Sequence, residues 1–292
     1  MCMDKVNINA ELVQDLISQQ FPQYCGLPIQ PVEEQGHDNR MFRLGTELTV
    51  RLPSAQAYAD HVYLEWEHLP KLQKMLDFPI AVPIALGQPA ARFPFPWTIG
   101  RWIPGQTVTH ENVCDEIQFA RELSSWLRQL QAVDALNVPL AGTHNFFRGG
   151  DLSVYHQETQ DALEYLKSVL PSENIRQYRK IWEDALSTRY SGTPMWVHGD
   201  VAVGNLLVKD GRLAALIDFG TFAAGDPACD YVMAWTFFGA SARHVFLAGL
   251  PEDMILRAKG WALWKALITY HDENPKPQAL SQIVLHAMLE EE

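Results

Sequence analysis

Hydrophobic and polar positions alternate in two different ways along this chain. Near the start they follow helical spacing, and over residues 7–20 one face of the predicted helix is formed by Ile8, Leu12, Leu16 and Ile17. Short strand-like runs then follow, separated by turn residues, at 28–35, 41–44, 48–52, 80–86 and 97–103. A long helix is predicted over 56–76. Residues 1–104 therefore predict a β-rich part in which one helix lies between the third and fourth strands.

Beyond Pro104-Gly105 the pattern becomes mostly helical. Helices are predicted over 112–133, 151–169, 172–189, 228–238, 252–271 and 276–289. A short β-rich island interrupts them, at 195–197, 206–208 and 213–217. The sequence therefore predicts an α+β chain with a β-rich part, residues 1–104, a short hinge, and a mostly helical part, residues 105–292.

Composition narrows the class of protein. The chain has 292 residues, of which 47% are hydrophobic and 20% charged, so it can bury a core. Lys plus Arg number 23 and Asp plus Glu 35, which gives a formal charge of −12. This balance argues against a nucleic-acid partner, because duplex binding needs a basic surface. It leaves room for a nucleotide ligand, whose phosphates Mg²⁺ and one local cation can hold.

Membrane and disulfide signals are lacking in the sequence. No apolar run approaches the roughly 18 residues that a membrane span needs. The first residues, MCMDKVNINAELVQ, show no basic segment followed by an apolar one. Cys2, Cys25, Cys114 and Cys229 lie far apart and are expected to be reduced thiols. We predict a cytoplasmic protein with no membrane partner.

The strongest chemical signal follows residue 195. In His198-Gly199-Asp200 and Asn205, the Asp and the Asn are separated by four residues, the spacing of a kinase catalytic loop. Asp218, in Asp-Phe-Gly, follows a later strand. A carboxylate can orient a hydroxyl nucleophile and accept its proton, which suits Asp200. Asn205 and Asp218 offer the oxygen ligands that Mg²⁺ prefers. His198 is expected to support the loop.

A second candidate group lies upstream. Arg51 ends a predicted strand and Glu65 lies on the following helix, as a Lys and a Glu do in kinases. The guanidinium can bridge a phosphate and a carboxylate. The alternative is a strand-edge Arg beside a solvated Glu65, or a pair with Glu67.

Two further segments could contact a nucleotide. The turn that contains Gly36 and Asn39 falls where a phosphate-covering loop belongs, although it could equally be an ordinary hairpin. Trp102 and Ile103 lie in WTIGRWIP, where an extended backbone could bind a purine edge. Structural packing alone would produce the same apolar stretch.

Two carboxylates after the Asp-Phe-Gly segment have an expected structural role. Asp226 precedes Pro227 and is a candidate helix cap. Asp230 falls in the first turn of that helix and could hydrogen-bond the catalytic loop. Trp261 and Trp264 have helical spacing and are expected in the core, with an aromatic platform for a cation as the alternative.

Taken together, these motifs resemble the aminoglycoside phosphotransferase family of small-molecule kinases. The resemblance spans nearly the whole chain, through GHDNRMFRLG, VRLP, the Glu65 helix, RWIPG, HGDVAVGNLLV, IDFG and GDPACDY. It implies a protein-kinase-like two-lobed fold with ATP or GTP in the cleft. It also implies Mg²⁺-dependent transfer of the γ-phosphoryl group to a hydroxyl of a small molecule. By motif match, Asp200 would be the base, Asn205 and Asp218 the metal ligands, and Arg51 with Glu65 the phosphate-anchoring pair.

The resemblance fixes the reaction better than the acceptor. Arg51 stands where many members have Lys, and His37 where similar sequences often have Trp. The family also includes kinases of choline, homoserine, sugars and macrolides. The charge of −12 is compatible with a cationic aminoglycoside. Carboxylates expected on the acceptor side, or alternatively on solvated helix faces, are Asp151, Glu158 and Asp161.

Two other functions compete with a small-molecule kinase. One is a non-catalytic nucleotide-binding regulator, against which the intact Asp200, Asn205 and Asp218 argue. The other is a protein kinase, which is disfavoured because Ala202 stands where a Lys would be expected and the segment after Asp-Phe-Gly is short.

Overall fold

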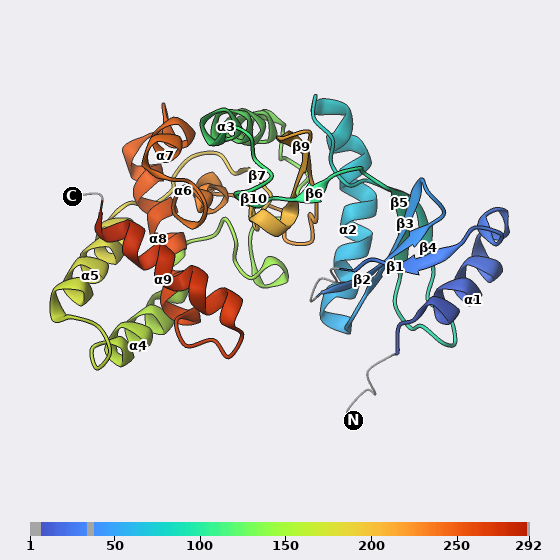
Figure 1. Ribbon diagram of the computed structural model, residues 1–292, viewed down its shortest axis with the longest axis horizontal. Coiled ribbons are helices and arrows are strands. Elements are labelled where there is room, and N and C mark those ends of the chain that lie inside the picture. Colours follow the sequence, from blue (N-terminus) through green and yellow to red (C-terminus); the bar gives the residue numbers. More distant parts are fainter. Residues whose placement is uncertain (1–6, 34–37, 291–292) are drawn as a thin grey trace. The chain divides into compact units, whose positions relative to one another are not determined.

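The computed structural model describes residues 7–33 and 38–290, and its chain divides into two compact units (Figure 1). The first unit is the chain up to Gly105 together with Ala214–Gly220, and the second is Gln106–Leu213 with the chain from Thr221 onward. The sequence-based division at residues 104 and 105 assigns Ala214–Gly220 to the helical part, whereas in the structure this segment belongs to the first unit. It packs with the first unit because Leu216 pairs with Ile80 and its backbone N–H donates to Pro79 O at 3.1 Å.

The first unit is built on one antiparallel sheet with the order β1-β2-β3-β5-β4. Its strands are β1 (Ile29–Pro31), β2 (Asn39–Leu44), β3 (Leu48–Pro53), β4 (Pro83–Gly87) and β5 (Trp97–Arg101). Helix α1 (Ala10–Gln20) precedes the sheet. Helix α2 (Gln56–Leu72), followed by η2 (Gln73–Met75), connects β3 to β4. The predicted five strands and intervening helix are confirmed.

Alternation along β3 places one cation on the edge of the core. Val50 and Leu52 are fully buried and pack with Leu12 and Leu16 of α1. Because successive side chains of a strand point to opposite faces, Arg51 points away from that cluster. α1 itself starts where the Asn9 side chain accepts a hydrogen bond from the backbone N–H of Leu12 at 2.9 Å.

The second unit is mostly helical. Its helices are α3 (Glu116–Ala132), α4 (His156–Leu166), α5 (Ser172–Ser187), α6 (Met233–Thr236), α7 (Ala240–Leu247), α8 (Glu252–Thr269) and α9 (Pro275–Leu289). Its short strands are β6 (Gln106–Thr107), β7 (Met195–Val197), β8 (Leu206–Lys209), the start of β9 (Arg212–Leu216) and β10 (Ala223–Gly225). β7 pairs with β10, and β6 with β8. With the sheet of the first unit, this confirms the predicted α+β class.

The elements that differ from the prediction are short. Residues 228–238 form a 3-10 turn, η6 (Pro227–Tyr231), and the single turn α6 in place of one helix. β6, β10 and α7 were not predicted. β10 has no alternation to detect, because its sequence is Ala-Ala-Gly and all three residues are buried. α3 begins later than predicted because Asp115 caps it, accepting from Gln118 N at 2.9 Å.

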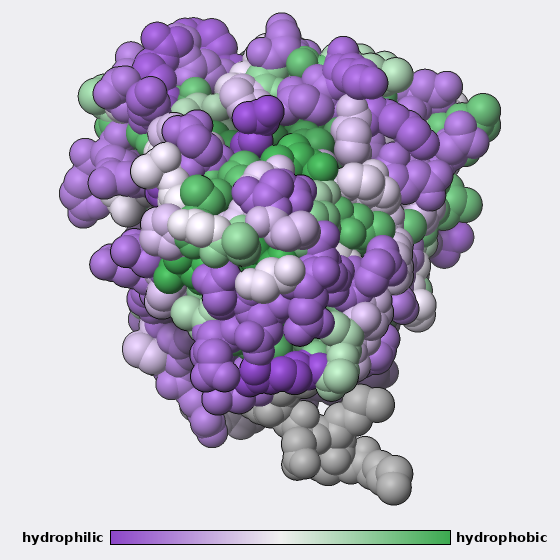
Figure 2. All heavy atoms as spheres, turned by 90° about the vertical axis from the view of Figure 1, so that its right-hand side faces the viewer, coloured by the Kyte–Doolittle hydropathy of each residue, from purple (hydrophilic) through white to green (hydrophobic). Residues whose placement is uncertain are grey.

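Among the described residues, no helix is both long enough and apolar enough to cross a bilayer. Cys25, Cys114 and Cys229 are free thiols. The face of the molecule in Figure 2 is mostly hydrophilic, with smaller hydrophobic areas between the polar ones.

Candidate active site

The His198-Gly199-Asp200 turn follows β7 and is held by one buried carboxylate. Asp230 accepts hydrogen bonds from the backbone N–H groups of His198 and Gly199, both at 2.8 Å. Asp230 and His198 are fully buried, whereas Asp200 is exposed. The Asp200 backbone N–H donates to His198 Nδ1 at 3.2 Å. Buried groups thus fix a turn that presents one carboxylate to solvent.

Gly199 has to be glycine in this turn. Its φ of +83° lies in the left-handed region, and a Cβ there would lie 2.4 Å from the carbonyl oxygen of Thr221. Thr221 also donates its hydroxyl to His198 O at 3.1 Å. The turn and the segment that starts at Thr221 are therefore in direct contact, with no room for a side chain between them.

Asn205 is bound to Asp200 through its amide nitrogen. Its Nδ2 donates to the backbone oxygen of Asp200 at 2.8 Å and to Oδ2 at 2.9 Å. In the described part of the chain, its Oδ1 accepts no hydrogen bond. The amide is thus oriented so that its oxygen stays available as a ligand for a cation.

In the first unit, Arg51 connects three polar side chains. One of its terminal nitrogens donates to Glu65 Oε1 and Oε2, at 2.7 and 2.6 Å, and the other donates to Asp218 Oδ1 at 2.5 Å. The amide oxygen of Asn39 accepts from Arg51 Nε at 3.0 Å and from a terminal nitrogen at 2.7 Å. Glu67 is instead exposed and 3.7 Å from Lys71. The structure therefore selects Glu65 as the partner of Arg51.

The charges of this group are strongly coupled. Burial acts to lower the pKa of Arg51, but Glu65 and Asp218 overcome it, so the pKa is raised and the guanidinium stays charged. Burial raises the pKa of Glu65, with Arg51 opposing and Asp218 adding to the effect. Asp218 has a φ of +60° and a side chain that is 44% exposed. A non-glycine residue in this conformation is strained, and such strain is often found at functional sites.

The remaining residues predicted to contact a nucleotide have different surroundings. Gly36 lies outside the described residues. Trp102 is half-buried, its backbone N–H donates to Glu47 O at 2.8 Å, and the Arg43 guanidinium lies 3.9 Å from its ring centroid. Ile103 is half-buried beside it in the chain. The side chain of Asn39 is a partner of Arg51, and its contact with a phosphate stays a prediction.

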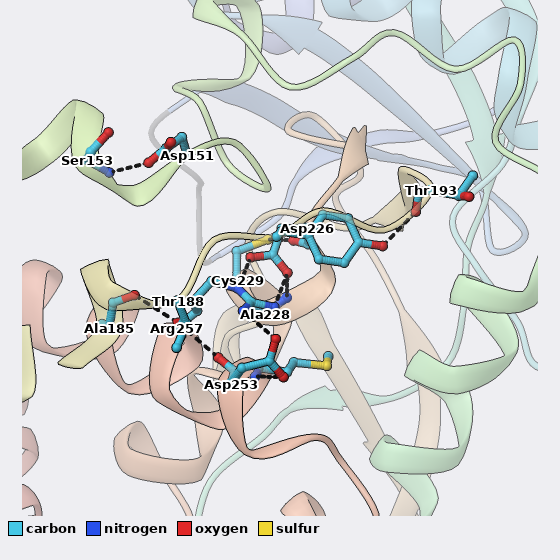
Figure 3. A network of polar contacts seen from close by, with 12 residues as sticks. Asp151, Ser153, Ala185, Thr188, Thr193, Asp226, Ala228, Cys229, Asp253 and Arg257 are labelled. Carbon is cyan, nitrogen blue, oxygen red and sulfur yellow. Dashed lines mark hydrogen bonds and ion pairs between the residues drawn. The ribbon is translucent and has the colours of Figure 1, made fainter.

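Asp226 belongs to a buried ion pair that the sequence did not reveal (Figure 3). It caps η6 by accepting from the backbone N–H of Ala228 at 3.1 Å, and Arg257 Nε of α8 donates to its Oδ2 at 2.6 Å. Arg257 also contacts Asp253 at 3.0 Å. Burial raises the pKa of Asp226, and Arg257 opposes this. The pair joins α8 to the segment that carries Asp230.

The three carboxylates predicted on the acceptor side are dispersed. Asp151 caps the 3-10 turn η4 (Leu152–Tyr155), which lowers its pKa, and lines a cavity of about 420 Å³ together with Arg257. Asp161 is exposed and accepts from Gln157 at 2.8 Å. Glu158 accepts from Trp264 Nε1 at 2.7 Å. Of these three carboxylates, Glu158 is the one that accepts a hydrogen bond from a tryptophan of α8 in the described part of the chain.

A loop that the sequence did not predict touches the His198-Gly199-Asp200 turn. The buried Asn145 donates to Arg148 O at 2.7 Å and to Thr221 O at 3.1 Å. A Cβ on Gly199 would lie 3.1 Å from Arg148 Cβ, so this arginine lies against the turn. The Gly149-Gly150 pair after Arg148 was the available signal, since paired glycines mark a tight loop.

The residues available for a metal ion are few. Residues 7–33 and 38–290 contain no group of three or more His, Cys, Asp or Glu side chains that could hold one. Asn205 and Asp218 nevertheless offer an amide and a carboxylate oxygen. Such sparse ligation suits Mg²⁺, which commonly binds one or two protein oxygens together with substrate phosphates and water. The donor chemistry therefore fits this ion.

The antiparallel sheet, the helical second unit and the two polar loops define a kinase-like phosphotransferase fold. Residues 29–277 match the family described as "Phosphotransferase enzyme family", and the chain belongs to that family.

Solved structures share the fold at low sequence identity. APH(2″)-IIIa in complex with GDP and kanamycin is 19% identical and has a TM-score of 0.71, with 96% of this chain and 97% of that chain covered. The GDP complex of aminoglycoside 2′-phosphotransferase-IIIa is 18% identical, with a TM-score of 0.76 and coverage of 97% and 99%. Macrolide 2′-phosphotransferase MphH from Brachybacterium faecium is 19% identical, with a TM-score of 0.59 and coverage of 97% and 98%.

A relative from Bacillus subtilis (strain 168), the uncharacterized protein YcbJ, is 27% identical over 178 residues. The match covers 60% of this chain and 52% of the relative, so it spans about half of that protein's length.

We predict that the Asp226–Arg257 pair is essential for the stability of the second unit. Arg257→Met leaves a buried carboxylate unpaired, which should lower the free energy of unfolding by about 3–5 kcal/mol. Urea unfolding followed by tryptophan fluorescence measures this change. The double variant Asp226→Asn/Arg257→Met should recover part of the loss, because no buried charge remains.

Arg176→Met is the matched control, since Arg176 is exposed and pairs only with Glu173 in the described ion pairs. It should change the stability by less than about 1 kcal/mol. Equal losses for Arg257→Met and Arg176→Met would contradict a special role of the buried pair.

Proposed function

We propose that this protein is a Mg²⁺-dependent kinase that transfers the γ-phosphoryl group of ATP or GTP to a hydroxyl of a small molecule. The observation that carries the proposal is the double hydrogen bond from Asn205 to Asp200. It fixes an exposed carboxylate and a free amide oxygen in one rigid arrangement. A base and a metal ligand held together in this way suit phosphoryl transfer, in which positioning and charge neutralisation provide most of the catalysis.

Each polar residue then has a chemical task. Asp200 orients the acceptor hydroxyl and takes its proton as the hydroxyl oxygen bonds to the γ-phosphorus. The bond from that phosphorus to the bridging oxygen breaks, and the nucleoside diphosphate leaves with the electron pair. Arg51, held by Glu65, offers positive charge to the nucleotide phosphates. His198, Asp226 and Asp230 support the loop from the buried side.

Magnesium would be bound by Asn205 Oδ1 and by the Asp218 carboxylate. When bound, the ion neutralises phosphate charge and orients the leaving diphosphate. Asp218 is paired with Arg51 in the structure, so the same carboxylate has a cationic partner before any metal binds. Asn39 and Glu65 keep Arg51 in place in either case.

The comparisons support nucleotide-dependent transfer to a small hydroxyl compound. The two aminoglycoside enzymes are GDP complexes, one of which holds kanamycin, and the third is a macrolide phosphotransferase. Trp102 and Ile103, at the end of the first unit, are our candidates for contact with the purine. A role in antibiotic resistance would follow if the acceptor is a drug of either class.

We predict that Asp200→Ala lowers the rate of phosphoryl transfer by about 10²–10⁴-fold, because no base remains to take the hydroxyl proton. Nucleotide affinity should change little. Release of ADP or GDP across a panel of hydroxyl acceptors measures the first quantity, and calorimetric titration with ATP and GTP the second.

Glu164→Ala is the control for loss of one exposed carboxylate from the second unit, and it should leave the rate unchanged. Full turnover in Asp200→Ala would reject Asp200 as the base. Tight nucleotide binding by the wild-type protein without release from any acceptor would favour the non-catalytic regulator.

We also predict that Asn205→Leu raises the Mg²⁺ concentration for half-maximal turnover by about 10–100-fold, since the amide oxygen is lost while the leucine keeps similar bulk. Titration of Mg²⁺ at saturating nucleotide measures the shift. If Asn205→Leu lowers the rate without changing the Mg²⁺ requirement, Asn205 acts only by positioning Asp200.

A further inference from the structure

A cluster of aromatic rings and cations lies in the second unit, formed by Arg148, Tyr155, Trp264 and Lys265. The rings of Tyr155 and Trp264 are stacked, with centroids 3.8 Å apart. The Arg148 guanidinium lies 4.8 Å from the Trp264 ring centroid, and Lys265 Nζ lies 5.9 Å from it. Two positive charges therefore share one aromatic ring.

This cation–aromatic cluster lies beside the proposed base. Arg148 Cβ would be 3.1 Å from a Cβ on Gly199, the residue before Asp200. The charge of Asp200 also acts on Lys265, together with those of Arg148, Glu158 and Asp272. Both cations therefore belong to the surroundings of the Asp200 carboxylate.

The loop that carries Arg148 is tightly fixed. Phe146 and Phe147 both have left-handed φ values, of +54° and +53°, which are unfavourable for side chains of this size. Tyr155 compensates by donating its hydroxyl to Phe146 O at 2.7 Å, and Asn145 holds Arg148 O. The loop keeps an unfavourable backbone in place at the position that presents the guanidinium.

Within the described residues, no Asp or Glu lies within ion-pair distance of Arg148 or Lys265. Glu158 of α4 accepts a hydrogen bond from Trp264 Nε1. Loss of hydration around the ammonium group lowers the pKa of Lys265, and Arg148 lowers it further, while Asp200, Glu158 and Asp272 act in the opposite direction. A ligand with an anionic group would place a negative charge beside these two cations and reduce the repulsion between them.

We propose that the acceptor is a hydroxyl compound with an anionic group, a carboxylate or a phosphate, which Arg148 and Lys265 bind beside Asp200. The inference rests on the proposed function and specifies its substrate class. A guanidinium can bind either anion through two parallel hydrogen bonds, and the ammonium adds a second charge. The stacked rings of Trp264 and Tyr155 form an aromatic surface that supports the guanidinium of Arg148. A polycationic aminoglycoside would instead bring like charges towards Arg148 and Lys265, which disfavours it.

The test compares hydroxyl acceptors that carry negative, zero or positive charge. Release of nucleoside diphosphate is measured with gluconate and glucose 6-phosphate, with neutral glucose, and with the cationic choline and kanamycin. We expect the anionic compounds to be preferred, and the better of gluconate and glucose 6-phosphate tells a carboxylate site from a phosphate site. For that compound, Arg148→Gln and Lys265→Gln should each raise the KM by about 10–100-fold with a nearly unchanged kcat.

Arg176→Gln removes one exposed positive charge from the same unit and should leave the KM unchanged. Arg148→Lys keeps the charge without the fork and should give an intermediate KM. A preference for neutral or cationic acceptors that Arg148→Gln does not alter would overturn the proposal. It would also be overturned if Arg148→Gln lowered kcat equally for every acceptor at constant KM, because the guanidinium would then act on the transferred phosphoryl group.

Direct binding separates this inference from the proposed function. Gluconate and glucose 6-phosphate are titrated calorimetrically into the wild-type protein and into Arg148→Gln and Arg176→Gln. Binding that is lost only in Arg148→Gln supports the anion site even if no compound is phosphorylated. Absence of binding by both anions to the wild-type protein overturns the inference, whereas the proposed kinase reaction would still be judged by the Asp200 variant.

Discussion

The His198-Gly199-Asp200 turn of this protein depends on a buried carboxylate that accepts hydrogen bonds from two backbone N–H groups. Asp230, whose own exposure is 0%, binds His198 and Gly199, and these bonds replace the water that a buried peptide would otherwise need. Burial raises the pKa of Asp230, while the two donors and His198 oppose the shift. The turn is thus shaped from inside the unit, and the Asp200 carboxylate stays exposed, where it accepts a hydrogen bond from Asn205.

Arg51 of the first unit and Arg148 of the second have different surroundings. In the first, Arg51 is saturated by Glu65, Asp218 and Asn39, so its guanidinium is fixed before any ligand binds. In the second, Arg148 rests on aromatic rings and has no carboxylate partner among the described residues. An arginine held by carboxylates provides positive charge at a fixed position, whereas an arginine that rests on aromatic rings is available to bind an anion. The net charge of −12 conceals this local contrast.

Sequence patterns predicted the long elements and the chemical motifs well. The five-stranded sheet and the long helices follow from clear hydrophobic periodicity, and the fold class and the family resemblance are confirmed. The proposed roles of Asp200, Asn205 and Asp218 stay predictions. The contacts of Arg51 with Asp218 and of Asp226 with Arg257 could not be predicted from the sequence, because the two residues of each pair are distant along the chain. β10 and the left-handed loop before Arg148 lack any periodic signal.

Asn145 joins two segments of the second unit through a single neutral amide. Its nitrogen donates to Arg148 O and Thr221 O, and its oxygen accepts from Gly142 N at 2.9 Å. The backbone around Arg148 is therefore not free to be remodelled without disturbing the residue next to the Asp-Phe-Gly segment. A change of acceptor in this protein would accordingly require exchange of side chains on an unchanged loop backbone, because an insertion or deletion there would break the hydrogen bonds of Asn145.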